Sequence, residues 1–144
     1  AEGTHGHISE WNVSGVTDMS TLIRTYCGTG GVITKGTFNE DLSGWDVSAV
    51  TNMEGTFYAT SLNQPLSGWN VSAVTNMKRM FQSASSFNQP LSEWGVSAVT
   101  TMYAMFYSAS SFDQVLCWNV TGVSNIVYMF GESPGSVNGA CTKC

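Results

Sequence analysis

The sequence predicts an α/β repeat solenoid of about five stacked coils, each with one short parallel β-strand and one short helix or 3₁₀ turn. Three observations predict this class. A tryptophan-led phrase recurs at a nearly fixed spacing, apolar residues within it switch between strand and helix spacing, and no copy can bury its apolar face alone. The copies open at Trp11, Trp45, Trp69, Trp94 and Trp118, and the first is interrupted after Cys27 before it resumes at 38–42.

The strand of each coil is predicted at its tryptophan. Trp69 and Val71 are expected to face the interior, because side chains alternate along a strand. Asn70 and Ser72, at the intervening positions, are expected to face solvent. Each coil would add one strand to a parallel sheet, about 4.8 Å from the last.

The helix of each coil is predicted from the segment 74–84. Its apolar residues are spaced by three and four positions, at Val74, Met77, Met80, Phe81 and Ala84. The hydroxyl of Thr75, at the start, is expected to cap free backbone N–H groups. Equivalent Trp, Met and Phe residues of successive coils would form columns, so we assign them to the core and give them no cofactor role.

The chain is predicted to form one domain, 1–144, which is long enough to bury a core. We divide it into a leader (1–10), a first coil (11–42) with an insertion (27–36), three regular coils (43–66, 67–91 and 92–116) and a C-terminal capping coil (117–144).

The charge balance excludes one class of partner. Charged residues make up 10% of the chain and the net charge is −5, whereas nucleic-acid binding needs clustered Lys and Arg. No apolar run reaches the length of a membrane span. The start at Ala1, without an initiator methionine, fits a secreted chain that has lost its signal peptide, and it fits a trimmed chain equally well.

The phrase WNVSAVTNMKRMFQSASSFNQPL resembles the repeat of roughly 25 residues, W-D-V-S-x-V-T-x-M-x-x-M-F, of the BspA-like leucine-rich-repeat surface proteins. The resemblance covers residues 11–26 and 38–141. It implies a solenoid like that of leucine-rich repeats, an extracellular or cell-surface location, and a non-catalytic role that is often adhesion.

Three N-glycosylation sequons occupy one register of the repeat, at Asn12, Asn70 and Asn119. The predicted alternation turns these asparagines toward solvent. They lie in alternate coils, which would separate neighbouring sugars by about 10 Å instead of about 4.8 Å. The other interpretation is a polar ladder, copied by repeat duplication, that carries no sugar.

The four cysteines, Cys27, Cys117, Cys141 and Cys144, are predicted to form disulfides. A bond from Cys117 to Cys141 or Cys144 would staple the C-terminal end. Four coil steps of about 4.8 Å then separate Cys27 from the remaining cysteine, which exceeds the roughly 7 Å limit between bonded Cα atoms. A bond between protomers is therefore favoured, and an internal bond through the inserted loop is the alternative. A single C-x-x-C pair predicts no zinc site.

The sequence predicts no enzyme. His5 and His7 lie in the polar leader, which we interpret as a flexible or docking segment rather than a metal site. The acidic residues scatter over different coils, whereas a carboxylate hydrolase needs them together in a cleft. No nucleophile elbow, phosphate loop or HExxH motif is present. We therefore predict no catalytic residue, no metal and no cofactor.

The ends of a solenoid are open sheet edges, which bind other chains unless they are capped. A head-to-tail contact that does not close into a ring produces a fibre. We therefore expect a non-enzymatic extracellular structural protein, a glycan-coated subunit of a head-to-tail surface filament or layer. Its partners would be further copies of itself, bound through the ends and the leader. The alternative is a cell-surface adhesion module that binds a carbohydrate or a host protein through the hydroxyl ladders that begin at Ser48 and Thr51.

Overall fold

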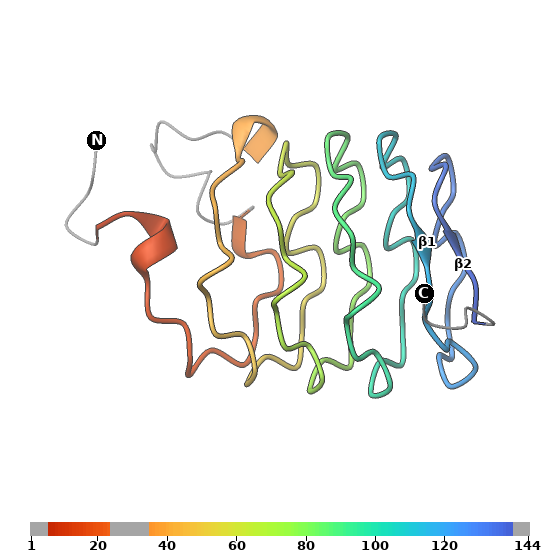
Figure 1. Ribbon diagram of the computed structural model, residues 1–144, viewed down its shortest axis with the longest axis horizontal. Helices are drawn as coiled ribbons and strands as arrows, with labels where there is room; N and C mark the ends of the chain where they lie inside the picture. Colours follow the sequence, from red (N-terminus) through yellow and green to blue (C-terminus); the bar gives the residue numbers. More distant parts are fainter. Residues whose placement is uncertain (1–5, 24–34, 140–144) are drawn as a thin grey trace.

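The computed structural model describes residues 6–23 and 35–139. Its elements are the 3₁₀ helices η1 (Ile8–Glu10) and η2 (Lys35–Thr37) and the strands β1 (Val115–Leu116) and β2 (Ser136–Val137). The two strands form a parallel sheet in which Val115 pairs with Ser136 and Leu116 with Val137. Neighbouring copies of the repeat lie side by side (Figure 1).

The predicted α/β solenoid, with one strand and one helix in each of about five coils, is wrong. The described residues contain only two strands, of two residues each, and outside Leu22 and Ile23 they contain no α-helical residue. The sheet therefore does not gain a strand with each copy. Neighbouring copies are joined instead by single parallel bridges between equivalent residues, Asp18 to Asn52, Asn52 to Asn76, Asn76 to Thr101 and Thr101 to Asn125.

The segment 74–84 is a run of turns, because its backbone N–H groups bond to the next copy. The N–H groups of Met77, Arg79, Phe81 and Ser83 donate to the carbonyls of Thr101, Tyr103, Met105 and Tyr107, over 3.0, 2.9, 2.9 and 2.8 Å. An α-helix would keep those donors within the segment. Arg79 and Ser83 have φ values of 55° and 58°, which no right-handed helix accommodates. The Thr75 hydroxyl does not cap a helix and donates instead to the Thr51 carbonyl.

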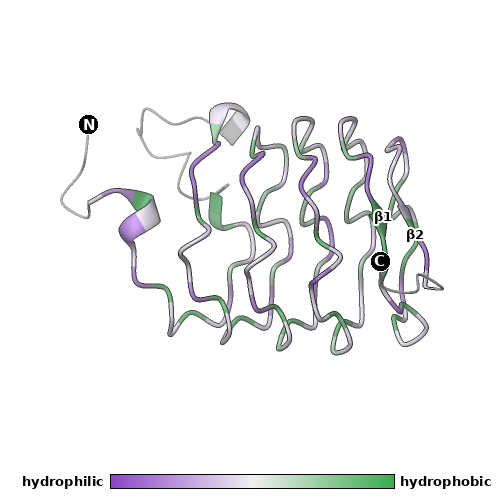
Figure 2. Ribbon diagram, viewed as in Figure 1, coloured by the Kyte–Doolittle hydropathy of each residue, from purple (hydrophilic) through white to green (hydrophobic). Residues whose placement is uncertain are grey.

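The strand predicted at Trp69 is also absent. Its N–H donates back to the Leu66 carbonyl over 3.0 Å, and the Val74 N–H donates to the Val71 carbonyl over 2.9 Å. Two tight turns therefore bracket Trp69 and Val71. Both side chains are nevertheless buried, as the alternation predicted. Apolar and polar residues alternate along the chain in every copy (Figure 2).

The core consists of equivalent residues packed against one another. The phenylalanine rings of successive copies are stacked, with centroids 5.5 Å apart for Phe57 and Phe81 and 5.4 Å apart for Phe81 and Phe106. Trp45 stacks on Trp69, and Trp94 on Trp118. Each buried indole N–H also finds an acceptor in the preceding copy, as when Trp94 donates to the Leu66 carbonyl over 2.9 Å. The predicted ring columns are confirmed for these pairs.

The N-terminal segment continues this pattern. The Ile8 carbonyl accepts the Trp11 backbone N–H and the Trp45 indole N–H. The Leu42 carbonyl does the same for the Trp45 backbone and the Trp69 indole. Ile8, which we had placed in the leader, thus takes the leucine position of the repeat. The predicted domain boundaries are otherwise untested, and most of the insertion 27–36 lies outside the described residues.

Candidate functional site

The C-terminal end of the array exposes a row of backbone donors. In the copy before it, the N–H groups of Met102, Ala104, Phe106 and Ser108 donate to the carbonyls of Asn125, Val127, Met129 and Gly131. The equivalent donors of the last copy are those of Ile126, Tyr128, Phe130 and Glu132. Within residues 6–23 and 35–139 these donors bond to no backbone carbonyl. We call the segment 125–132 the C-terminal edge.

Apolar side chains are exposed beside these donors. Ile126, Val127 and Tyr128 are 44%, 52% and 62% exposed. The residues equivalent to Ile126 in earlier copies, such as Met77 and Met102, are 0% exposed. Ile126 is therefore exposed because no described copy follows it, and not because its position is polar.

The N-terminal end presents acceptors in the matching register. In the second and third copies the carbonyls of Asn52 and Asn76 accept N–H groups from the copy before. The equivalent carbonyl of the first copy is that of Asp18, and the Ser20 carbonyl corresponds to that of Glu54. Within the described part of the chain neither accepts a backbone N–H. We call the segment 17–22 the N-terminal edge.

Each end also carries a shallow depression lined by equivalent residues. The N-terminal one, of about 510 Å³, is lined by Trp11, Asn12, Val13, Val16, Met19 and Leu22, among others. The C-terminal one, of about 390 Å³, includes Trp118, Asn119, Thr121 and Val123. Trp11, Val16, Val123 and Phe130 are only partly buried against the core. The two depressions therefore share three positions of the repeat, those of Trp11 and Trp118, of Asn12 and Asn119, and of Val16 and Val123.

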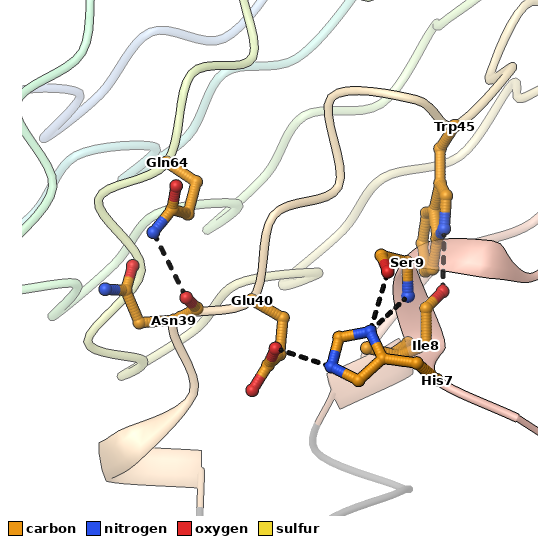
Figure 3. A network of polar contacts seen from close by, with 7 residues as sticks. All are labelled: His7, Ile8, Ser9, Asn39, Glu40, Trp45 and Gln64. Carbon is orange, nitrogen blue, oxygen red and sulfur yellow. Dashed lines mark hydrogen bonds and ion pairs between the residues drawn. The ribbon is translucent and has the colours of Figure 1, made fainter.

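His7 joins the N-terminal segment to the end of the first copy (Figure 3). Its Nδ1 accepts the Ser9 N–H over 3.3 Å and lies 2.6 Å from the Ser9 Oγ. Its Nε2 lies 3.1 Å from a Glu40 carboxylate oxygen. With Nδ1 as the acceptor, Nε2 carries the proton that Glu40 accepts. This contact ties the segment to the array, whereas the sequence predicts a flexible or docking segment. His5 lies outside the described residues.

The predicted glycosylation sites are exposed, and each forms a local turn. The Oδ1 of Asn70 accepts the Ser72 N–H over 3.1 Å and the Ser72 hydroxyl over 2.7 Å. Asn12 and Asn119 make the same two bonds. Asp46 does so as well without forming a sequon, and the Ser48 donors lower the pKa of its carboxyl. The turn alone therefore explains why an acceptor and a hydroxyl recur two residues apart. Glycosylation itself stays a prediction.

Of the four cysteines, only Cys117 belongs to the described residues, and it is disulfide-bonded. Cys27, Cys141 and Cys144 lie outside the described residues, so the predicted pairing is untested. Within residues 6–23 and 35–139 no group of three His, Cys, Asp or Glu side chains is placed to hold a metal.

Asparagine side-chain amides form a ladder between copies that the sequence analysis does not predict. The Oδ1 atoms of Asn39, Asn63 and Asn88 accept the backbone N–H of the equivalent residue one copy later, over 2.8, 3.0 and 3.0 Å. The recurring F-N-Q-P-L phrase was the available signal. The threonine ladder likewise serves the backbone, since the Thr100 hydroxyl donates to the Thr75 carbonyl over 3.1 Å. These hydroxyls therefore use their proton within the array, and recognition of a ligand by the hydroxyl ladders stays a prediction.

No helix in the described part of the chain is long and apolar enough to cross a membrane. Comparison with curated proteins and with solved structures gave no match. The model of one family, described as "Mycoplasma protein of unknown function, DUF285", matches residues 1–28 and 29–142, and the match is consistent with a resemblance to BspA-like repeat proteins. Because the match extends over nearly the whole sequence, the chain belongs to the DUF285 family.

Proposed function

We propose that this protein is a non-enzymatic structural subunit, located outside the cell or on its surface, that associates end to end with further copies of itself. One observation carries the proposal: within residues 6–23 and 35–139 the N–H groups of Ile126, Tyr128, Phe130 and Glu132 have no backbone acceptor, and the carbonyls of Asp18 and Ser20 have no backbone donor. Open edges of this kind bind other chains unless they are covered.

We build the proposed contact between two molecules on the bonds that join copies inside one molecule. Continuing their register places the Ile126 N–H against the Asp18 carbonyl of a second molecule and the Tyr128 N–H against its Ser20 carbonyl. The two molecules would then be one copy apart, about 4.8 Å between backbones. A contact of this head-to-tail kind builds an open filament when the rotation between subunits does not close a ring.

The same register buries the exposed apolar residues. Ile126, which is 44% exposed, would approach Met19, and Val123 would lie over Val16, two valines that are only partly buried within one molecule. Burial of apolar area contributes about 25 cal/mol per Å² removed from water. We call this end-to-end contact the joint. Hydrogen bonds fix its register, and apolar burial supplies most of its free energy.

An extracellular or surface location is supported by the resemblance to BspA-like proteins and by the disulfide at Cys117, since disulfides persist in oxidising compartments. End-to-end association limits which of the sequons can carry a glycan. Asn119 and Asn12 would belong to adjacent copies across the joint, where glycans about 4.8 Å apart would collide. The joint therefore accommodates a glycan at Asn70 but not at both terminal sequons.

The test is to place a charge at the joint and, as a control, on an exposed surface away from it. Ile126→Lys puts an ammonium where the neighbouring core would close, and it is expected to abolish association because an unpaired buried charge is costly. Val115→Lys is the matched control. Val115 is 57% exposed, but its backbone already pairs with β2.

Sedimentation velocity over a range of concentrations, together with negative-stain microscopy, measures the outcome. We expect filaments or concentration-dependent oligomers for the unmodified protein and for Val115→Lys, and monomers for Ile126→Lys. A monomer at every concentration for the unmodified protein, or equal association of both variants, would contradict the proposal.

A further inference from the structure

One face of the array gathers tyrosines from different copies around a single arginine. Tyr128 contacts Tyr103 and Tyr107 edge to face, with ring centroids 6.1 and 6.3 Å apart. The Arg79 guanidinium lies 5.7 Å from the centroid of the Tyr103 ring. With Gln82, these residues line a shallow depression of about 320 Å³. We call Arg79, Gln82, Tyr103, Tyr107 and Tyr128 the tyrosine face.

The tyrosine face contains polar groups that the protein itself does not satisfy. The Gln82 Oε1 is buried and has no hydrogen-bond donor. Such an orphaned acceptor costs free energy and calls for a specific explanation. Arg79 forms no ion pair within the described residues, whereas the neighbouring Lys78 pairs with Glu54 over 3.2 Å. The Arg79 cation is thus available to a ligand, beside the Tyr103 ring.

The backbone places these groups and keeps the depression open. Arg79 and Ala104 occupy equivalent positions with φ values of 55° and 51°. The small side chain of Ala104 leaves room at the floor of the depression, between the tyrosine rings. At the far side the Tyr107 ring packs against Gly131, where any Cβ would lie 2.6 Å from a ring carbon. The open depression therefore depends on two small residues, Ala104 and Gly131.

We propose that the tyrosine face binds an acidic saccharide, with one sugar ring lying against the tyrosines and its carboxylate on Arg79. Ring faces supply flat apolar area for the C–H face of a sugar. The guanidinium matches a carboxylate in its planar, two-pronged geometry. Arg79 is the charged side chain that lines the depression and attracts an anion, and Glu132, which bonds to Tyr107, carries a carboxylate that the ligand's carboxylate has to avoid.

The inference does not depend on end-to-end association: the two proposals share only Tyr128, through its ring here and through its backbone N–H there, and Arg79 lies in an interior copy. It is tested with hyaluronan tetrasaccharide, which carries carboxylates, and with cellotetraose, a neutral saccharide of the same length. Isothermal titration calorimetry and NMR chemical-shift mapping report binding, and we expect the acidic saccharide alone to bind. The Ile126→Lys variant should bind it equally, which separates a failure of this proposal from a failure of the assembly.

The discriminating variants are Arg79→Gln and Lys78→Gln, which remove the same charge from adjacent positions. Loss of a charge-assisted, two-pronged bond is expected to weaken binding about tenfold or more in Arg79→Gln. In Lys78→Gln the affinity should change by less than about threefold, because Lys78 does not line the depression. Absence of binding, equal binding of the neutral saccharide, or equal effects of the two substitutions would overturn the proposal.

Discussion

The interior copy 76–84 and the last copy 125–132 share one backbone shape and differ in burial. The φ values of Arg79 and Ser83 are 55° and 58°, and those of Tyr128 and Glu132 are both 57°. Met77, however, is fully buried, whereas the equivalent Ile126 is 44% exposed. Local turns therefore set the backbone shape of a copy, whereas its apolar side chains are buried only when another copy packs on them. In such arrays stability is approximately a sum of terms between nearest neighbours.

The largest expected difference between the two regions lies in the phenylalanine column. Phe81 is buried between Phe57 and Phe106, so Phe81→Ala should lower the free energy of unfolding by about 3–5 kcal/mol. Phe130 has a stacked neighbour on one side, so Phe130→Ala should cost about 1–2 kcal/mol. Urea unfolding of dilute protein measures both. Equal losses would show that the last copy is packed as tightly as the interior.

A smaller difference is expected from the backbone. Ala104 and Ala109 are both buried, but only Ala104 has a positive φ, of 51°. Glycine removes a methyl group in either case, and at Ala104 it also relieves a strain of about 1 kcal/mol. Ala109→Gly should therefore destabilise the protein by about 1 kcal/mol more than Ala104→Gly. Thermal unfolding of the two variants tests this, and the opposite order would refute the role assigned to the turns.

The smallest effect is expected at Asp46, which forms in the second copy the turn that Asn70 forms in the third. The Ser48 side chain and backbone donors lower the pKa of the Asp46 carboxyl below 3.8. Because the folded pKa lies below the unfolded one, the stabilisation is present above about pH 4 and is lost as the pH falls through the folded pKa.

Asp46→Asn keeps the turn and removes this titration, so it should flatten the loss of stability below about pH 4. NMR titration of the Asp46 carboxyl checks the direction of the shift. A value above 3.8 would contradict the bonding described here.

The period and the buried positions could be predicted from the sequence. Trp69, Leu66 and Val71 face the core because repetition and alternation depend only on spacing. The helix over 74–84 could not be excluded in this way. The spacing of Met77, Met80 and Phe81 fits both a helical stripe and a run of turns whose N–H groups bond to the next copy. One signal was overlooked: Gly55 has a φ of 61° at the position of Arg79 and Ala104.

The candidate surfaces were predictable to different degrees. Open ends follow from any finite array, so the edges were expected, although the array is not the one predicted. Their division into donors and acceptors depends on bond directions that no sequence pattern specifies. The tyrosine face depends on residues such as Tyr103 and Tyr128, which break the repeat consensus, and consensus reading discards those residues.

The bonds between 76–83 and 100–107 nearly all run one way, with N–H groups pointing toward the C-terminal end. Aligned peptide dipoles add up, as they do along a helix. A filament joined through these edges would therefore be polar. Its electrostatic potential would be positive at the C-terminal tip and negative at the N-terminal tip. Subunit addition at the two tips would have different rate constants and a different sensitivity to salt.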